Sequence, residues 1–138
     1  MVEIIVAATQ MACVRDSVKN VSRAEELVRE AAGKGAQIIL LQELFETPYF
    51  CQDQNRHHLR LAKEADDNPL LKRMSKLAEE LSVVLPVSFF EKANKTFFNS
   101  MMMIDADGSF LGTYRKSHIP NDPGYWEKFC FSPGSLGM

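Results

Sequence analysis

The sequence has few cysteines, no excess of charge of either sign and no long apolar segment. Its three cysteines, Cys13, Cys51 and Cys130, are odd in number and widely spaced. That pattern fits neither a disulfide framework nor a zinc site of the C-x-x-C type. We interpret them as small buried hydrophobic residues in a reducing compartment, which predicts a cytoplasmic protein.

Other absences exclude several kinds of partner. The net charge is −2, with both signs interspersed, which argues against nucleic acid. No apolar run approaches the roughly 20 residues of a membrane-spanning helix. Residues 1–8 lack the positive charge and the cleavage site of a secretory signal. We therefore expect neither a membrane partner nor secretion.

The histidines are not arranged as metal ligands. His57 and His58 are adjacent, so they would point to different faces of a helix, and His118 stands alone. We expect no metal and no other cofactor. With 46% hydrophobic and 25% charged residues, the composition is that of an ordinary globular domain, and one domain is the default at this length.

Hydrophobic patterning predicts a strand–helix–strand unit at the start of the chain. Residues 3–9 (EIIVAAT) form a β-branched run that predicts a buried strand. Apolar residues then recur every three or four positions over 18–31, which predicts an amphipathic helix ended by Gly33 and Gly35. The continuous apolar run in 37–42 predicts a second strand, parallel to the first and buried on both faces.

The middle of the chain carries a clear helix start. Residues 53–67 are polar and compatible with a helix that turns Leu59 and Ala62 inward. Asn68 and Pro69 then suit the N-cap and first position of a helix, whose apolar face continues to Leu81.

The remainder reads as strands followed by a long loop. Residues 83–90 predict a third strand, in which Pro86 points to a sheet edge or a bulge because it cannot donate to a ladder. Residues 96–104 and 110–114 flank an Asp-Gly turn and predict a hairpin. Residues 115–129 have no steady period, and a loop of this length is commonly functional.

Two charged residues follow predicted strands and are candidates for catalysis. Glu43 comes after the strand in 37–42, where ligands bind in open α/β sheets, and a partly desolvated carboxylate there could be a general base. Lys116 follows the second hairpin strand. If the strand ends adjoin, the pair would supply the base and the oxyanion stabiliser of acyl transfer. The alternatives are a solvated Glu43 and a surface ion pair contributing under ~1 kcal/mol.

The flanks of both residues resemble the nitrilase (carbon–nitrogen hydrolase) superfamily. Residues 42–45 (QELF) match the family's glutamate motif and residues 114–120 (YRKSHIP) match its lysine motif. The sequence also resembles the branch of this family that acts on N-carbamoylputrescine, at residues 85–90, 104–108 and 127–129. The resemblance covers essentially the whole chain.

The resemblance implies a fold larger than these residues can build. The family domain is an α/β fold, a four-layer α-β-β-α sandwich of roughly twice this length. Residues 1–138 would be the N-terminal part of that single domain, with no second domain. Its sheet edges and apolar helix faces would be left open, and such surfaces favour association. A homo-oligomer is therefore expected.

The resemblance also assigns roles. Glu43 matches the general base, Lys116 the residue that stabilises the tetrahedral oxyanion, and Glu127 a second glutamate that positions the substrate and the lysine. The family's nucleophile is a cysteine in a C-W-D type motif downstream of a turn that matches 133–134. The present sequence does not contain it, so this chain is expected to be inactive alone.

The implied reaction is hydrolysis of a non-peptide C–N bond in a small molecule. N-carbamoylputrescine would give putrescine, carbon dioxide and ammonia. The alternatives are β-ureidopropionase-like or ω-amidase-like specificity, or a non-catalytic truncated form acting only through subunit association. For the cationic end of the substrate we suggest Glu46 or Asp122, and Tyr49, Tyr125 and Trp126 would wall the slot for its methylenes.

Overall fold

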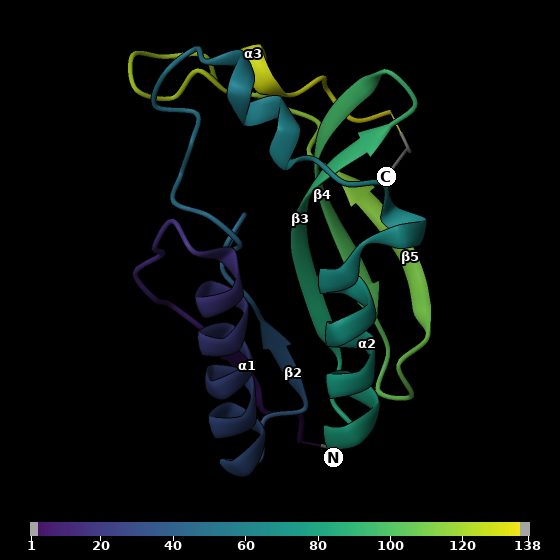
Figure 1. The fold of residues 1–138 in the computed structure, drawn as a ribbon. Coiled ribbons are helices and arrows are strands. Elements are labelled where there is room, and N and C mark those ends of the chain that lie inside the picture. Colours follow the sequence, from purple (N-terminus) through teal and green to yellow (C-terminus); the bar gives the residue numbers. More distant parts are fainter. Residues whose placement is uncertain (1–2, 136–138) are drawn as a thin grey trace.

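Two long helices cover one face of a set of five strands in the computed structural model, which describes residues 3–135 (Figure 1). The strands are β1 (Val6–Ala8), β2 (Ile38–Leu40), β3 (Leu85–Ala93), β4 (Thr96–Ile104) and β5 (Phe110–Arg115). The helices are α1 (Ser17–Gly33), α2 (Pro69–Leu81) and the short α3 (Glu127–Cys130), with 3₁₀ helices η1 (Arg56–Leu61) and η2 (Ala65–Asp67). Within this part of the chain, no helix combines the length and apolar character needed to cross a membrane.

Helix α1 confirms the first predicted helix and is fixed at its start by a capping residue. The Asp16 carboxylate accepts hydrogen bonds from the backbone N–H groups of Val18 (3.0 Å) and Lys19 (3.3 Å), which satisfies donors that the first turn leaves unpaired. The helix ends at Gly33, close to the predicted stop. Gly35 follows with a φ of +90°, a conformation that favours glycine.

Helix α2 begins as the sequence predicts. The Asn68 side-chain oxygen accepts from the backbone N–H of Leu70 at 2.9 Å, and Pro69 is the first helical residue. The inward face comprises Leu70, Leu71, Met74, Leu77 and Ala78, while Leu81, the predicted end of this face, is partly buried. The preceding segment, 53–67, forms η1 and η2 rather than one regular helix.

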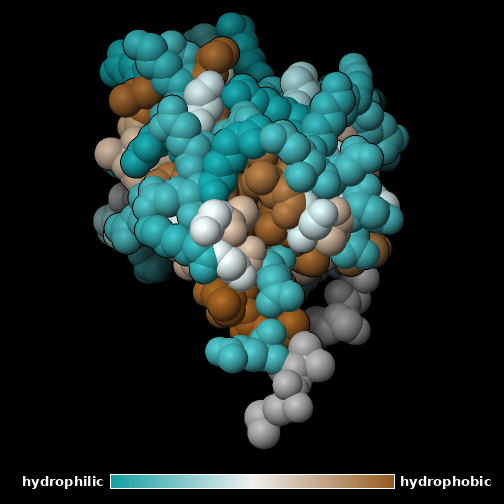
Figure 2. All heavy atoms as spheres, turned by 90° about the horizontal axis from the view of Figure 1, so that it is seen from below, coloured by the Kyte–Doolittle hydropathy of each residue, from teal (hydrophilic) through white to brown (hydrophobic). Residues whose placement is uncertain are grey.

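The parallel strand pair is confirmed, but its predicted burial on both faces is wrong. Strand β1 pairs with β2 in parallel, with Val6 opposite Ile38. Ile39 is fully buried, whereas Val6 is 68%, Ile38 36% and Leu40 47% exposed. The helices lie on only one face, so alternate side chains of these strands point to the open face. Figure 2 shows hydrophobic side chains at the surface on the lower end of the molecule.

Pro86 explains why the strands separate into two sheets. Val84 N–H donates to the Gln37 carbonyl (2.8 Å), and Ile39 N–H donates to the Val84 carbonyl (3.0 Å). The next bond of a parallel ladder would need the N–H of residue 86, which proline lacks. Pairing with β2 therefore stops there, and β3 becomes the edge of the β3–β4–β5 sheet. The prediction of an edge position for Pro86 is confirmed.

Strands β4 and β5 form the predicted antiparallel hairpin, with an irregularity in register between Met103 and Ile104. The turn includes Gly108 at a φ of +81°. A Cβ on Gly108 would lie 2.8 Å from the carbonyl oxygen of Ser75, so only glycine lets the turn pack against α2. The loop after β5 contains α3, which the sequence did not indicate. Residues 136–138 lie outside the described part.

Apolar packing forms two clusters. The larger lies between the two long helices and the strands. The smaller is aromatic: the Phe90 ring lies 5.1 Å from that of Phe50 and 5.0 Å from that of Phe131. Face-to-edge and offset contacts of this kind add to the stabilisation from burial. This second cluster also includes Cys51 and Cys130 and supports the loop that carries α3.

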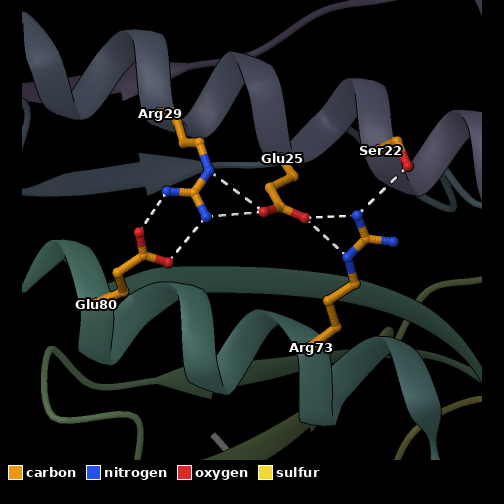
Figure 3. A network of polar contacts seen from close by, with 5 residues as sticks. All are labelled: Ser22, Glu25, Arg29, Arg73 and Glu80. Carbon is orange, nitrogen blue, oxygen red and sulfur yellow. Dashed lines mark hydrogen bonds and ion pairs between the residues drawn. The ribbon is translucent and has the colours of Figure 1, made fainter.

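A polar network joins α1 to α2 on their outer side (Figure 3). The Glu25 carboxylate accepts from Arg29 on its own helix (2.9 Å) and from Arg73 of α2 (2.8 Å). Arg29 also donates to Glu80 of α2 (2.7 Å), and Arg73 to Ser22 of α1 (3.3 Å). Arg29, Arg73 and Glu80 are substantially exposed, while the Glu25 side chain between them is only 19% exposed. Because most of these charges are exposed, the network fixes the pairing of the helices more than it stabilises the fold.

We predict that Leu71→Ala lowers the free energy of unfolding by about 2–5 kcal/mol, because this side chain is fully buried and its removal leaves a cavity. Lys72→Ala, at the exposed neighbouring position of the helix, is the control and should change it by less than about 0.5 kcal/mol. Denaturant unfolding followed by the fluorescence of the single tryptophan measures both. Equal effects of the two substitutions would contradict the packing described for α2.

Candidate active site

The centre of the candidate site is the Lys116 ammonium, which lies between two carboxylates. Its Nζ is 3.2 Å from Oε1 of Glu43 and 2.9 Å from Oε2 of Glu127. Glu43 follows β2, Lys116 follows β5, and Glu127 is the first residue of α3. The structure thus brings together the three residues to which the sequence assigns catalytic roles and confirms that the two strand ends adjoin.

The backbone of Lys116 is held from both sides. Its N–H donates to the Asn99 carbonyl (2.9 Å), and its carbonyl accepts from the Gly134 N–H (2.9 Å). A Cβ on Gly134 would lie 2.2 Å from the carbonyl oxygen of Arg115. Glycine is therefore required for this close approach of the two backbone segments.

A buried ion pair lies on the other side of the sheet from Lys116. Successive residues of a strand point to opposite faces, and Arg115 donates to both carboxylate oxygens of Glu91, at 2.7 Å from Nε to Oε2. Ser100 donates to the same carboxylate (2.6 Å), and the guanidinium lies 4.0 Å from the centre of the Phe98 ring. Bidentate pairing fixes the end of β5 directly before Lys116.

Glu127 is the most enclosed of the three charged residues, with its side chain only 5% exposed. Its Oε1 accepts from the Tyr49 hydroxyl (3.0 Å), while Oε2 accepts from Lys116. The N–H of the preceding Trp126 donates to the Cys51 carbonyl (2.7 Å), which ties α3 to the aromatic cluster. Both oxygens of this carboxylate accept a hydrogen bond, so it is placed to orient the lysine.

Glu43 is less enclosed than expected. Its side chain is 56% exposed, so the expectation of a partly desolvated carboxylate is wrong for this part of the chain. The hollow beside it is lined by Leu40, Ser88, Met101 and Tyr114. All of these lie on the sheet face that neither long helix covers, which leaves the carboxylate open to solvent.

Two features beside Glu43 were missed from the sequence. Leu44 has a φ of +52°, a left-handed conformation that is costly for a bulky residue and is often found at functional sites. Its N–H donates to the Ser88 hydroxyl (2.9 Å), which stabilises this turn. In addition, the Asn99 side-chain amide donates to Oε1 of Glu43 at 2.6 Å. The available signal was a buried Asn-Ser pair inside the apolar strand sequence FFNSMMM.

The electrostatics of the site keep Lys116 charged. Burial by itself would lower the pKa of Lys116, but its hydrogen bond to Glu127 and the charges of Glu43 and Glu127 outweigh this effect and raise the pKa above its ordinary value. Burial and the hydrogen bond to Glu127 raise the pKa of Tyr49 as well. At neutral pH the site therefore holds an ammonium and a neutral phenol, which are donors and not bases.

None of the three thiols is placed as a nucleophile. Cys51 and Cys130 are buried, as predicted, and a hydrogen bond with Cys130 together with burial raises the pKa of Cys51. Cys13 is only partly buried, which corrects the prediction, and its thiol donates to the Phe45 carbonyl (3.4 Å). Burial is also the main factor that raises the pKa of Cys13. Cys13 and Cys51 therefore stay protonated and react poorly, and Cys130 is shielded from solvent by its burial.

The predicted substrate-binding residues separate into two places. Tyr49 contacts Glu127, and its ring lies 5.9 Å from that of the exposed Tyr125. Asp122 is exposed and exchanges backbone hydrogen bonds with Tyr125, so it belongs to the same loop. Trp126 leads directly into α3.

Glu46 does not join this group. Its carboxylate accepts from the Lys63 ammonium at 2.6 Å, and it lines hollows that include Ser17 and Lys63 instead of Glu43. Within residues 3–135, no three His, Cys, Asp or Glu side chains are gathered as a metal site would require.

Comparison with known proteins places this chain in one family. The family model described as carbon-nitrogen hydrolase matches residues 5–138. An N-carbamoylputrescine amidase of Arabidopsis thaliana is 57% identical over 136 residues, which are 99% of this chain and 46% of that protein. A citrullinase of Francisella tularensis is 45% identical over 138 residues, the whole of this chain and 48% of that protein.

A solved structure agrees with these matches. The crystal structure of a carbon-nitrogen hydrolase from Helicobacter pylori G27 superposes with a TM-score of 0.90 at 37% identity, covering 97% of this chain and 46% of that one. The chain thus spans about half the length of the relatives it matches.

The buried ion pair beneath the site predicts a pH dependence of stability. Burial alone would raise the pKa of Glu91, but hydrogen bonds from Arg115 and Ser100 and the charge of Arg115 outweigh it and hold this pKa below its ordinary value. A lowered folded-state pKa contributes stability above the unfolded-state pKa, and this contribution is lost as the pH falls through the folded-state value.

We expect Glu91→Gln to lower the free energy of unfolding at pH 7 by about 3 kcal/mol, because it leaves a buried guanidinium without its charge partner. The difference from the parent protein should shrink as the pH falls below about 4.5. Denaturant unfolding at pH 7 and pH 3.5 measures this, with the exposed Glu26→Gln as the control. A difference independent of pH would contradict the ion-pair assignment.

Proposed function

Because this chain belongs to the carbon–nitrogen hydrolase family of the nitrilase superfamily, we propose that it is the N-terminal part of an amidase that hydrolyses N-carbamoylputrescine. The observation that carries the proposal is the Lys116 ammonium held between Glu43 and Glu127. A base beside an oxyanion-binding cation is the pairing that thiol-dependent acyl transfer requires.

The nucleophilic cysteine and a layer that covers the open sheet face would come from a second half of the domain. The relatives are about twice as long as this chain, and the open sheet face offers exposed Val6, Leu40 and Tyr114 side chains for packing. A second sheet on this face would complete a four-layer α-β-β-α sandwich, enclose Glu43 and bring the nucleophilic cysteine to it. Enclosure would also strengthen every charge interaction in the site.

In the first step of the proposed reaction Glu43 takes the proton of the cysteine thiol, which is mostly protonated at neutral pH. The thiolate attacks the carbamoyl carbon, and the Lys116 ammonium stabilises the oxyanion that forms. The C–N bond to the terminal nitrogen then breaks. Glu43 returns the proton to this nitrogen, so that ammonia leaves and a thioester remains.

In the second step Glu43 takes a proton from water, and the resulting hydroxide attacks the thioester carbon. The C–S bond breaks, the thiolate recovers the proton, and the carbamic acid that leaves decomposes to carbon dioxide and putrescine. Throughout, Glu127 holds Lys116 charged and in place, since its own two oxygens are occupied by Lys116 and Tyr49.

The cationic end of the substrate would be met by Asp122 in preference to Glu46. Glu46 is already paired with Lys63, so its charge is largely neutralised. Asp122 is exposed in the loop that carries Tyr125, whose ring faces Tyr49 next to the charged centre. The methylene chain of the substrate would lie along these two rings.

Ammonia release tests the proposal. The samples are the 138-residue chain alone and a joined enzyme, in which residues 1–135 are followed by the remaining C-terminal part of the Arabidopsis thaliana relative. We expect release from N-carbamoylputrescine by the joined enzyme only. A preference for an ω-amide, a β-ureido acid or citrulline would favour the alternative specificities. Activity of the chain alone would contradict the view that its nucleophile lies elsewhere.

We predict that Lys116→Ala in the joined enzyme lowers kcat by at least about 10²-fold, the usual scale for loss of an oxyanion donor. Lys95→Ala removes an exposed lysine in the β3–β4 turn and should leave kcat unchanged. Steady-state ammonia release at saturating substrate measures both. Retained turnover in the Lys116 variant would reject its role.

For the substrate amine, Asp122→Asn should raise KM for N-carbamoylputrescine roughly tenfold, corresponding to about 1.4 kcal/mol of lost ion pairing. An uncharged carbamoyl amine of equal length should show no such change. The exposed Asp66→Asn is the matched control. An unchanged KM for the cationic substrate would remove Asp122 from the binding site.

A further inference from the structure

We propose that Asn99 is a positioning residue that fixes the general base and the oxyanion lysine relative to each other, and that Oε2 of Glu43 is the atom that takes the proton. The inference rests on the proposed function, since it assigns a role within that reaction. It concerns a residue that lies outside the motifs of Glu43, Lys116 and Glu127.

The two oxygens of Glu43 are in different surroundings. Oε1 accepts from the Asn99 amide at 2.6 Å and from the Lys116 ammonium at 3.2 Å. Among residues 3–135, no hydrogen bond to Oε2 is found. Oε1 is therefore occupied by two donors, and a lone pair for proton transfer is available on Oε2.

Asn99 contacts both catalytic groups, through different atoms. Its side chain donates to Glu43, and its main-chain carbonyl accepts from the Lys116 N–H at 2.9 Å. The residue itself is only 5% exposed and stands in the middle strand of the β3–β4–β5 sheet, paired with Phe90. A rigid strand position thus sets the distance between the base and the oxyanion cation.

An amide is chemically suited to this role. Glu43 is half exposed, so without a second donor its carboxylate could rotate away from the lysine. An amide N–H holds an oxygen without adding charge and does not give up its proton at neutral pH. The transferred proton is therefore directed to Oε2. A buried asparagine in an apolar strand would be destabilising if its amide had no partner.

The contact is tested first in the chain itself, without any activity. In ¹H–¹⁵N NMR spectra of the 138-residue chain, one side-chain amide proton of Asn99 should be shifted downfield by its charged acceptor. Glu43→Ala should move this signal back upfield, whereas the exposed Glu26→Ala should leave it in place. An Asn99 amide signal that is the same in the parent chain and in Glu43→Ala would overturn the proposal.

The catalytic consequence is tested in the joined enzyme. Asn99→Leu keeps the buried volume but removes the donor, and Asn99→Asp replaces the donor with a second carboxylate that repels Glu43. We expect kcat to fall about tenfold for Leu, the scale of one hydrogen bond to a charged group, and further for Asp, with KM little changed. Gln54→Ala, which removes an exposed amide, should have no effect.

A structural role of Asn99 would give a different result. Asn99→Ser retains a shorter donor and should recover part of the kcat lost in the Leu variant, which a packing defect would not allow. Equal kcat in all Asn99 variants, or loss through KM alone, would overturn the proposal. If the joined enzyme without substitutions were inactive, the proposed function would fail, while the NMR result would still decide the contact.

Discussion

The Lys116 ammonium between two carboxylates is the interaction on which the candidate site depends. It joins three segments that are far apart in the sequence, the end of β2, the end of β5 and the start of α3. Each carboxylate helps to keep the lysine charged, and the lysine offsets the repulsion between them. Without the lysine, the two carboxylates would repel each other, and without either carboxylate, the lysine would lose one of its two opposite charges.

Because successive residues of a strand point to opposite faces, the ion pair of Arg115 and the contacts of Lys116 lie on different sides of the sheet. Arg115 points to one face of the sheet and is locked by the buried carboxylate of Glu91, while Lys116 points to the other face and stays accessible. The Arg115–Glu91 pair is buried, whereas the face that carries Lys116 is open because neither long helix covers it. In the proposed reaction, a base as exposed as Glu43 would need both a positioning donor and a covering layer to act efficiently.

The local signals in the sequence were reliable guides to the fold. The asparagine cap and first-turn proline of α2 and the Asp-Gly hairpin turn act within a few residues of themselves, and all were confirmed. The expected burial of both faces of β2 was wrong, because burial depends on what packs over a strand and not on its own residues. The sequence of residues 115–129 did not indicate α3, because four helical residues are too few to give a periodic pattern.

The sequence by itself determined the family and the three charged residues, because the flanking motifs of Glu43 and Lys116 are long and specific. Only the tertiary structure decided that these residues meet, that Glu46 is neutralised by Lys63, and that Asn99 donates to one oxygen of Glu43. The physical reason is distance along the chain. Asn99 and Glu43 are 56 positions apart, and only the packing of β2 beside the β3–β4–β5 sheet brings an amide and a carboxylate to within a hydrogen bond of each other.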